Sequence, residues 1–423
     1  MSQPARLTTS TSLFPARCAV STLFFINGLV LASWVPHIPA VKSQHAISDG
    51  QLGIVLLAMA VGSVFALPLA GWMINRYGSR RIVSLAALGF CLTLPLLILS
   101  PSIGLLAGTL ALFGACNGIL DVSMNAQAVT VERYYNRPIM SSFHGLFSLG
   151  GLTGAGVAGV GMSLGVGDLQ HCTAVTMVTV FTVFSVLRWL MPSSPHHDNP
   201  RPTFARPKGI LLSLGILAFF ALLTEGAMAD WSAVYLHDVL RTDAATAAVG
   251  FAACSLMMAV GRFGGDWLAR QISPWRLLQV SGALAAAGLG GGLLIGMPTF
   301  AVVGFGLVGL GIANMIPVLF SAAGRIPGVQ AGTALAAVAS TGYFGFLAGP
   351  PLIGFVAEAT SLPVALGIVS VCCMVIAVRA NAVGASLQNT GEQGTVPDRS
   401  PAYGRANCSQ EREEIHTKIG GYR

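Results

Sequence analysis

Two long uncharged stretches flank a short basic turn near the start of the chain. Residues 52–70 and 82–99 contain no Asp, Glu, Lys or Arg. Each is long enough to cross a lipid bilayer as a helix of about twenty residues. Between them lies GWMINRYGSRR, residues 71–81, which holds three arginines. The pattern predicts two membrane-spanning helices joined by a tight, arginine-rich loop.

The rest of the chain repeats this alternation of apolar blocks and short polar turns. Hydrophobic residues make up 54% of the 423 residues and charged residues only 9%, whereas about a quarter of a soluble domain is charged. The composition therefore predicts an all-α integral membrane protein with twelve spans. We place them at 17–38, 51–73, 82–99, 103–129, 139–162, 172–190, 209–234, 245–268, 277–296, 299–321, 332–356 and 362–380.

The basic residues are distributed unevenly between the predicted loops. The odd-numbered loops hold Lys42 and Arg241. The even-numbered loops hold Arg76, Arg80, Arg81, Arg133, Arg137, Arg188, Arg201, Arg206, Lys208, Arg270, Arg276 and Arg325. This is the positive-inside pattern, so both termini are expected in the cytoplasm. The net charge of +7 thus encodes topology and does not indicate a nucleic-acid partner.

A polar, proline-rich segment divides the chain into two sets of six spans. We expect a cytoplasmic N-terminal segment (1–16), a first bundle (17–190), a cytoplasmic linker (191–208), a second bundle (209–380) and a disordered cytoplasmic tail (381–423). The first span is expected to stay uncleaved. His196 and His197 in the linker could bind a metal, although adjacent histidines on a flexible segment are more often solvated. The eight cysteines show no metal-binding or redox spacing, so neither a metal nor a cofactor is expected.

The two sets of spans carry similar residues in the same order. Asn27-Gly28 followed by Trp34 in the first span parallels Glu225-Gly226 followed by Trp231 in the seventh. Gly114 and Asn117 in the fourth span parallel Gly311 and Asn314 in the tenth. The order of these matches favours two pseudo-symmetric six-helix bundles.

Polar residues inside predicted spans are the first candidates for function, because a charged group in the membrane is costly unless it is paired or hydrated. Asn117, Asp121 and Asn125 recur every four residues and so share one helix face. They are expected to line a cavity in which Asp121 takes up and releases a proton. The alternative is that this face makes hydrogen bonds between helices.

Glu225, near the middle of the seventh span, is the second candidate for protonation. His144, at the start of the fifth span, could form a proton relay with Asp121 or be a structural interfacial residue. Asp230, followed by Trp231, could bind substrate or lie at the membrane interface beside an anchoring aromatic ring.

The remaining candidates are divided between binding and gating. Asn27, Trp34, Asn314 and Tyr343 lie at depths where they could contact a ligand, although aromatic residues in spans more often serve packing. Arg262 and Asp266, four residues apart at the end of the eighth span, are expected to form an ion pair that serves a gate rather than a substrate site.

The basic turn resembles the signature loop of the major facilitator superfamily, whose usual form is Gly-x-x-x-Asp-Arg-x-Gly-Arg-Arg/Lys. The matching residues are Gly71, Asn75, Arg76, Gly78, Arg80 and Arg81. Asn75 replaces the usual acidic residue, which puts a charge-relay role of this loop in gating in doubt. The resemblance implies a gating loop and two bundles that rock about one central site lined by the first, fourth, seventh and tenth spans.

Three further runs resemble the bacterial MosC-like subgroup and, more distantly, the fucose and proton symporters. They are residues 121–127 (DVSMNAQ), 141–151 (SSFHGLFSLGG) and 229–231 (ADW). The resemblance implies location in the bacterial inner membrane. Because one chain supplies both bundles, a monomer is expected.

These observations predict a proton-coupled transporter of a small polar solute, such as a sugar or cyclitol. Two buried acids suit proton coupling, and Asn, Trp and His side chains suit a neutral hydroxylated ligand. Export of amphiphilic compounds is an alternative, although the fifth span lacks the proline of a typical drug-antiporter motif. A membrane-bound solute sensor is a further alternative. An enzyme is not expected, because the sequence has no Walker loop and no Ser-His-Asp arrangement.

Overall fold

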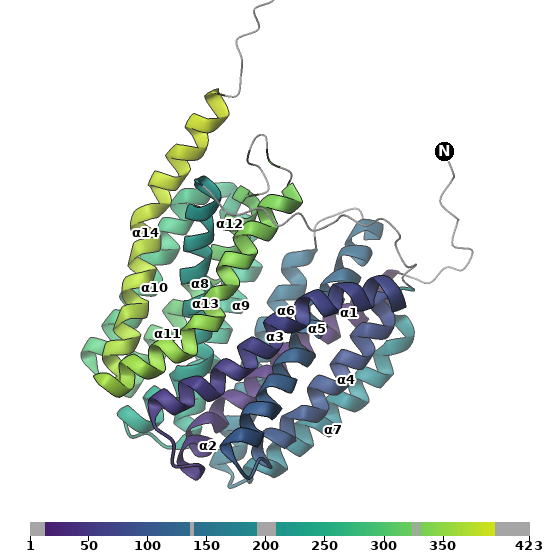
Figure 1. Cartoon of the computed structure of the whole chain (residues 1–423), viewed down its shortest axis with the longest axis vertical. Coiled ribbons are helices and arrows are strands. Elements are labelled where there is room, and N and C mark those ends of the chain that lie inside the picture. The colour runs from purple at the N-terminus through teal and green to yellow at the C-terminus, as the bar shows by residue number, and fades with distance from the viewer. Residues whose placement is uncertain are drawn as a thin grey trace, which may run out of the picture.

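The computed structural model of the chain describes residues 13–135, 139–192, 209–323, 326, 329 and 331–393, and within these ranges the regular structure is entirely helical. Figure 1 shows helices packed side by side in two groups. The predictions for residues 1–12, for the linker from 193 to 208 with His196 and His197, and for residues 394–423 fall outside the described residues.

The first half of the molecule consists of the helices before the linker, and the second half of those after it. The first half comprises α1 (Leu13–Trp34), η1 (Val35–His37), α2 (Ile38–Gln44), α3 (Asp49–Tyr77), α4 (Ser79–Ile98), α5 (Ile103–Tyr135), α6 (Met140–Ser163), α7 (Asp168–Val186) and η2 (Leu187–Trp189). The second half comprises α8 (Ile210–Val234), η3 (Tyr235–Val239), α9 (Ala244–Gln271), α10 (Pro274–Ile295), α11 (Pro298–Ile312), α12 (Met315–Ala323), α13 (Ala331–Ala359) and α14 (Leu362–Gln393).

These helices confirm the prediction of twelve spans. Eleven described segments are long and apolar enough to cross a membrane, and α13, with 29 residues, occupies the position of the remaining predicted span. The helices often extend beyond the predicted limits. In particular, α14 continues from the predicted end at residue 380 to Gln393, into the segment expected to be disordered.

Two predicted spans are interrupted rather than continuous. The first changes to the 3₁₀ turn η1 and then to α2, a segment that contains Pro36 and Pro39. The tenth is divided into α11 and α12, with Pro317 in the first turn of α12. Proline has no backbone N–H to donate to the preceding turn, and its ring crowds that turn, so helices kink or break there.

Equivalent helices of the two halves pack in equivalent ways. In the first half α1 packs on α6, α3 on α5, and α4 on both α5 and α7; in the second half α8 packs on α13, α9 on α11, and α10 on both α11 and α14. The halves meet at two contacts, α6 with α9 and α3 with α13. The pseudo-symmetry that relates one half to the other converts each of these contacts into the other. This arrangement confirms the predicted pseudo-symmetry of the two bundles.

Glycines allow α1 and α6 to pack with their backbones in contact. A Cβ atom on Gly28 would overlap the carbonyl oxygen of Phe147, and one on Gly154 would overlap that of Leu29. Such close approach is typical of membrane helices, where packing replaces the hydrophobic effect as the main attraction between helices. These contacts therefore hold α1 and α6 at a fixed spacing within the first half.

The two ends of the molecule differ in how the halves meet. We call the end that carries α2 the α2 end, and the opposite end, at which α8 begins, the linker end (Figure 1). Near the α2 end, α3 and α13 touch through backbone, because a Cβ atom on Gly354 would lie 2.6 Å from the Asp49 carbonyl oxygen. In Figure 1 the ribbons of the halves converge toward the α2 end and diverge toward the linker end.

The close packing of α1 on α6 leads to a first prediction. Gly154→Val should lower the free energy of unfolding by about 1–3 kcal/mol, because the added side chain overpacks the contact with Leu29. Gly156→Val, on the same helix, should change it little, since its Cβ atom would meet open space. Thermal unfolding in detergent measures both. Equal losses would contradict the assigned packing.

Candidate functional site

A large cavity lies between the two halves and has a volume of about 340 Å³. Residues of α1, α3, α5, α6, α8, α9 and α13 line it. Apolar side chains, including Phe24, Leu31, Phe147 and Phe346, form much of its wall. Its polar lining residues are Asn27, Trp34, Ser63, Asn117, Asp121, His144, Ser148, Glu225, Asp230, Ser255, Arg262 and Tyr343.

Helix α5 contributes two of the three residues predicted on its polar face. Asn117 and Asp121 line the cavity, and Asn125, one turn further on, is not part of the lining. Instead, Asn125 Nδ2 donates to the Asp121 backbone oxygen at 2.8 Å and to the Asp121 carboxylate at 3.1 Å. Asn125 therefore orients the carboxylate rather than facing a ligand.

Within the described part of the chain, three polar atoms of cavity residues are buried and have no hydrogen-bond partner. They are Asn27 Oδ1, Trp34 Nε1 and Asn117 Oδ1. Asn27 Nδ2 makes a weak contact with Met124 Sδ at 3.7 Å. Because a buried polar group without a partner costs about 1–3 kcal/mol, each of these atoms is satisfied only when a ligand, a water molecule or a side-chain movement supplies a partner. Together they offer two hydrogen-bond acceptors and one donor.

Arg262 lines the cavity and contacts two residues that the sequence did not pair with it. Its Nη1 donates to Ser148 Oγ at 2.7 Å, and its Nη2 lies 3.5 Å from Glu225 Oε1. The Asp266 side chain is outside the described residues. The sequence also places Ser255, Met258 and Arg262 three and four positions apart, so they share one face of α9. The prediction of an ion pair did not take this face into account. All three line the cavity.

The contact of Arg262 with Ser148 and Glu225 joins the two halves of the molecule. Ser148 belongs to α6 in the first half, whereas Glu225 and Arg262 belong to α8 and α9 in the second. Both charged side chains are largely buried, with 15% of Arg262 and 24% of Glu225 exposed. Because the 3.5 Å ion pair is long for a charged hydrogen bond, a proton or an anionic group can compete for either partner.

The other candidates differ in whether they reach the cavity. Asp230, His144 and Tyr343 line it. The His144 ring packs edge-on against Phe24, with centroids 5.2 Å apart. Within the described part of the chain, no direct hydrogen bond links His144 to Asp121, so the expected relay would need an intervening group.

Trp231 and Asn314 lie away from the cavity, contrary to the expectation that they contact substrate. Trp231 is fully buried in the apolar core. Asn314, at the break between α11 and α12, donates from Nδ2 to the Gly261 carbonyl oxygen at 3.0 Å. Its amide therefore anchors the helix break to α9. The internal repeat correctly related these residues to Trp34 and Asn117, but it did not show that only the first-half members face the cavity.

The basic segment at the junction of α3 and α4 contacts other residues of the first half. Gly78 has a φ of 83°, a conformation that glycine adopts without strain, and it joins α3 directly to α4. The Arg76 guanidinium lies over the Trp72 and Tyr77 rings, and Arg80 Nη2 donates to the Arg188 carbonyl oxygen at 3.3 Å.

The remaining residues of this turn are more open. Asn75 is exposed at least in part, as is Arg81, and a Cβ atom on Gly71 would meet open space. The gating role that the resemblance implies for this turn stays a prediction.

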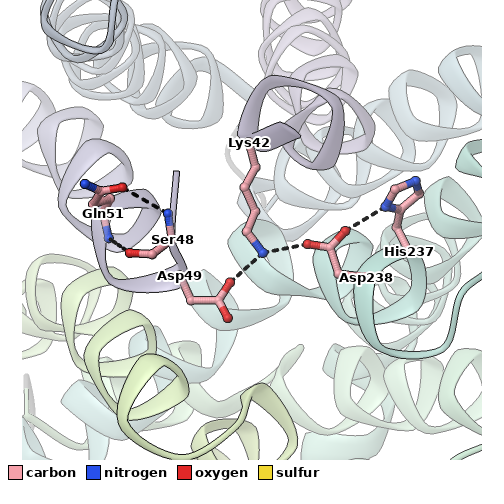
Figure 2. A network of polar contacts seen from close by, with 6 residues as sticks. All are labelled: Lys42, Ser48, Asp49, Gln51, His237 and Asp238. Atoms are coloured by element: carbon pink, nitrogen blue, oxygen red, sulfur yellow. Dashed lines mark hydrogen bonds and ion pairs between the residues drawn. The ribbon is translucent and has the colours of Figure 1, made fainter. Parts of the chain in front are cut away.

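A charged network closes the halves together at the α2 end, as Figure 2 shows. Lys42 Nζ of α2 lies 2.7 Å from Asp49 Oδ1, at the start of α3, and 2.6 Å from Asp238 Oδ2 in η3. His237 Nδ1 lies 2.7 Å from the other Asp238 oxygen. One lysine thus makes the charged contact between the halves at this end, a role that its position in the sequence did not indicate.

A helix cap holds Asp49, one of the two acidic partners of Lys42, in place. Ser48 caps α3 by accepting from the Gln51 backbone N–H, and the Gln51 side chain accepts from the Ser48 N–H (Figure 2). This capping box fixes the first turn of α3, which carries Asp49. We call Lys42, Asp49, Asp238 and His237 the α2-end clamp.

The α2-end clamp leads to a second prediction. Lys42→Met should open the α2 end, because it removes charged hydrogen bonds worth about 1.5 kcal/mol or more each, or about tenfold in population. In a chain without native cysteines, Ser63→Cys in the cavity should then react faster with an impermeant maleimide supplied at the α2 end. Lys42→Arg, which keeps the charge, should react at nearly the original rate. Equal rates with and without the Lys42→Met substitution would contradict closure by this clamp.

Comparison with known proteins places this architecture in a wide family. The family model described as the Major Facilitator Superfamily matches residues 20–327. An uncharacterized MFS-type transporter of Yersinia pestis is 38% identical over 361 residues, which are 85% of this chain and 94% of that protein. The membrane protein MosC of Rhizobium meliloti is 38% identical over 371 residues, 84% of this chain and 89% of that protein.

Solved structures with low sequence identity share the fold. The nucleoside transporter NupG covers 89% of this chain and 99% of its own, with a TM-score of 0.65 and 11% identity. A D-xylose-proton symporter covers 87% and 97%, with a TM-score of 0.69 and 13% identity. A variant of the E. coli fucose:proton symporter FucP covers 89% and 99%, with a TM-score of 0.57 and 16% identity.

Proposed function

This chain belongs to the Major Facilitator Superfamily of secondary transporters, and from that premise we propose that it couples movement of a small hydroxylated solute to movement of protons. As a member of this family it is a multi-pass membrane protein that transports a small molecule and is not an enzyme. The solute class and the coupling ion are our proposals. They rest on the cavity between the halves.

The observation that carries the solute class is the set of unpaired polar atoms on one side of the cavity. Asn27 Oδ1 and Asn117 Oδ1 can each accept a hydrogen bond and Trp34 Nε1 can donate one, and none of the three has a partner among the described residues. A compound with several hydroxyl groups satisfies both kinds of atom, because each hydroxyl donates and accepts. The aromatic and aliphatic walls can pack against its carbon skeleton, as in most small-molecule sites.

The acidic residues of the cavity support proton coupling. Asp121, Glu225 and Asp230 line the cavity together with Arg262. Within the described residues, no basic side chain forms an ion pair with Asp121 or Asp230. An unpaired carboxylate within the membrane is costly, and protonation removes that charge. Proton uptake at these acids is therefore a direct way to link cavity charge to the conformational change.

The solutes named for structural neighbours are consistent with this proposal. Nucleosides, D-xylose and fucose are all hydroxylated, and two of these three neighbours are described as proton symporters. At these low sequence identities the likeness shows the fold alone. The proposed solute class therefore rests on the residues that line this cavity.

The charge distribution supports an orientation. The linker end carries Arg76, Arg80, Arg81 and Arg188, whereas Lys42 and Arg241 lie toward the α2 end. By the positive-inside rule we place the linker end and both termini in the cytoplasm. The α2-end clamp would then close the outer side of a bacterial inner membrane. We propose a monomer as the working unit, since one chain supplies both halves of the cavity.

Export of amphiphilic compounds is the second candidate, and the apolar part of the cavity favours it. Phe24, Phe147, Phe251 and Phe346 would suit an aromatic or alkyl group. Raised drug tolerance on overexpression, without proton movement on addition of polyols, would support export. A solute sensor would instead show ligand protection of a cavity cysteine without solute movement.

Proton coupling leads to a third prediction. In de-energised right-side-out vesicles, one pool of sugars, cyclitols, amines or organic acids should make the external medium alkaline. Asp121→Asn and Glu225→Gln should each abolish this change, because neither side chain can then carry a proton. Asp243→Asn is the matched control, since Asp243 caps α9 away from the cavity and Asn also caps well. Full gradient-driven uptake by the double Asp121→Asn, Glu225→Gln chain would refute the proposal.

Hydrogen bonding by the solute leads to a fourth prediction. Trp34→Phe should weaken binding of the transported solute about 2- to 10-fold, because it removes one donor worth about 0.5–1.5 kcal/mol. Trp231→Phe removes an equally buried indole N–H outside the cavity and should leave affinity unchanged. Ligand-dependent thermal stabilisation of purified protein measures both. Equal losses in the two variants would show that the Trp34 N–H does not contact the solute.

A further inference from the structure

Two histidines and a cysteine converge in the first half, apart from the transport cavity. His37 lies in η1, directly after α1, whereas His171 and Cys172 lie in the first turns of α7. All three are almost completely buried, with exposed fractions of 0%, 5% and 0%. Helices α1 and α7 pack against each other, so the tertiary fold brings His37 to residues more than 130 positions away.

The potential ligand atoms of these residues are close to one another. His37 Nε2 and His171 Nδ1 are 2.9 Å apart. One ligand atom from each of His37, His171 and Cys172 lies within 4.8 Å of the others. Zinc bonds of about 2.0–2.1 Å to nitrogen and 2.3 Å to sulfur would place tetrahedral ligand atoms about 3.4–3.6 Å apart. Shifts of roughly an ångström would bring these atoms to that spacing.

An acidic residue supports His37 from its other ring nitrogen. Asp168 Oδ1 lies 3.1 Å from His37 Nδ1. Among the described residues Nδ1 has no hydrogen-bond partner, so a small reorientation would be needed for the carboxylate to accept its proton; a proton on Nδ1 would leave the Nε2 lone pair facing His171. The same carboxylate–histidine arrangement orients metal ligands in proteins and raises their basicity. Asp168 is 38% exposed, so it also marks the side from which an ion can enter.

We propose that His37, His171 and Cys172 form a binding site for a transition-metal ion of the zinc class, with water as the fourth ligand. Two imidazoles and a thiolate suit Zn²⁺, whereas Mg²⁺ and Ca²⁺ require oxygen ligands. On binding, the ion replaces the hydrogen bond between the two histidines. The Cys172 S–H loses its proton to solvent, and the sulfur lone pair forms the metal bond.

The position of this site suggests what the ion does. Segment 35–41, which begins with η1, connects Trp34 of the transport cavity with Lys42 of the α2-end clamp. A metal ion would tie this connection to α7 through His37. It would thus stabilise the fold at the α2 end, whatever solute the cavity accepts. The proposal concerns binding and does not depend on the proposed transport function.

Cobalt provides a direct test, because a Co²⁺–thiolate bond produces a charge-transfer band in the near ultraviolet. The full chain is purified in detergent, treated with a chelator, dialysed and titrated with Co²⁺ and then with Zn²⁺. We expect the thiolate band to appear with one Co²⁺ per chain, to be displaced by Zn²⁺ and to be accompanied by a higher thermal midpoint. Cys172→Ala should abolish the band, and His37→Gln should weaken binding at least tenfold.

Matched controls distinguish this site from other histidines and cysteines of the chain. Cys373→Ala removes an equally buried thiol in the second half, and replacing His196 and His197 with alanine removes the linker histidines. Neither change should affect the band. Absence of the band in the unaltered chain would overturn the proposal, as would its persistence in Cys172→Ala. Monodisperse elution of Cys172→Ala verifies that its loss of the band does not reflect unfolding.

Discussion

The structure depends on a constraint that the bilayer imposes on every polar side chain in a span. Lipid offers no hydrogen-bond partner, so a charge facing it costs several kcal/mol unless the side chain reaches water or a partner. In this protein the acids Asp121, Glu225 and Asp230 and the cation Arg262 all line the space between the halves. The charged groups of the described spans named here therefore lie at the interface between the halves, where a change in their protonation or pairing can affect how the halves pack.

The packing of the halves complements this polar interface. Glycine-mediated contacts such as Gly28 with Phe147 and Gly154 with Leu29 fix helices within the first half. Between the halves, the α2-end clamp relies on the ion pair of Lys42 with Asp238, whose partners can separate into water at modest cost. The halves also meet through helix packing, α6 on α9 and α3 on α13. Rigid-body alternation between two states would separate some of these contacts while each half keeps its internal packing.

The sequence predicted most of the fold because span length and hydropathy follow directly from the bilayer. It also predicted that Asn117 and Asp121 share a cavity-facing side of α5, because residues four apart on a helix share a face. Span length, hydropathy and helix periodicity do not determine which helices contact one another. The partners of Arg262 and the bridge made by Lys42 depend on how the halves meet. The approach of His37 to His171 likewise depends on packing between helices distant in sequence.

The internal repeat was informative about the fold but less so about the site. Trp34 and Trp231 occupy equivalent positions, yet one lines the cavity and the other is part of the apolar core. Asn117 lines the cavity, whereas its counterpart Asn314 secures a helix break. Two halves with a common fold can therefore contribute differently: the unpaired polar atoms of the cavity lie in the first half and the Arg262–Glu225 pair lies in the second.

Alternating access requires that the cavity open to the two ends of the molecule in turn. Paired spin labels test it directly: exposed Gln44 and Val239 report on the α2 end, and exposed Tyr134 and Gln271 report on the linker end. When solute and low pH favour opening of the α2 end, the first distance should lengthen while the second shortens in the same population. Distances that change in the same direction, or a linker end that stays fixed while the α2 end opens, would contradict alternating access.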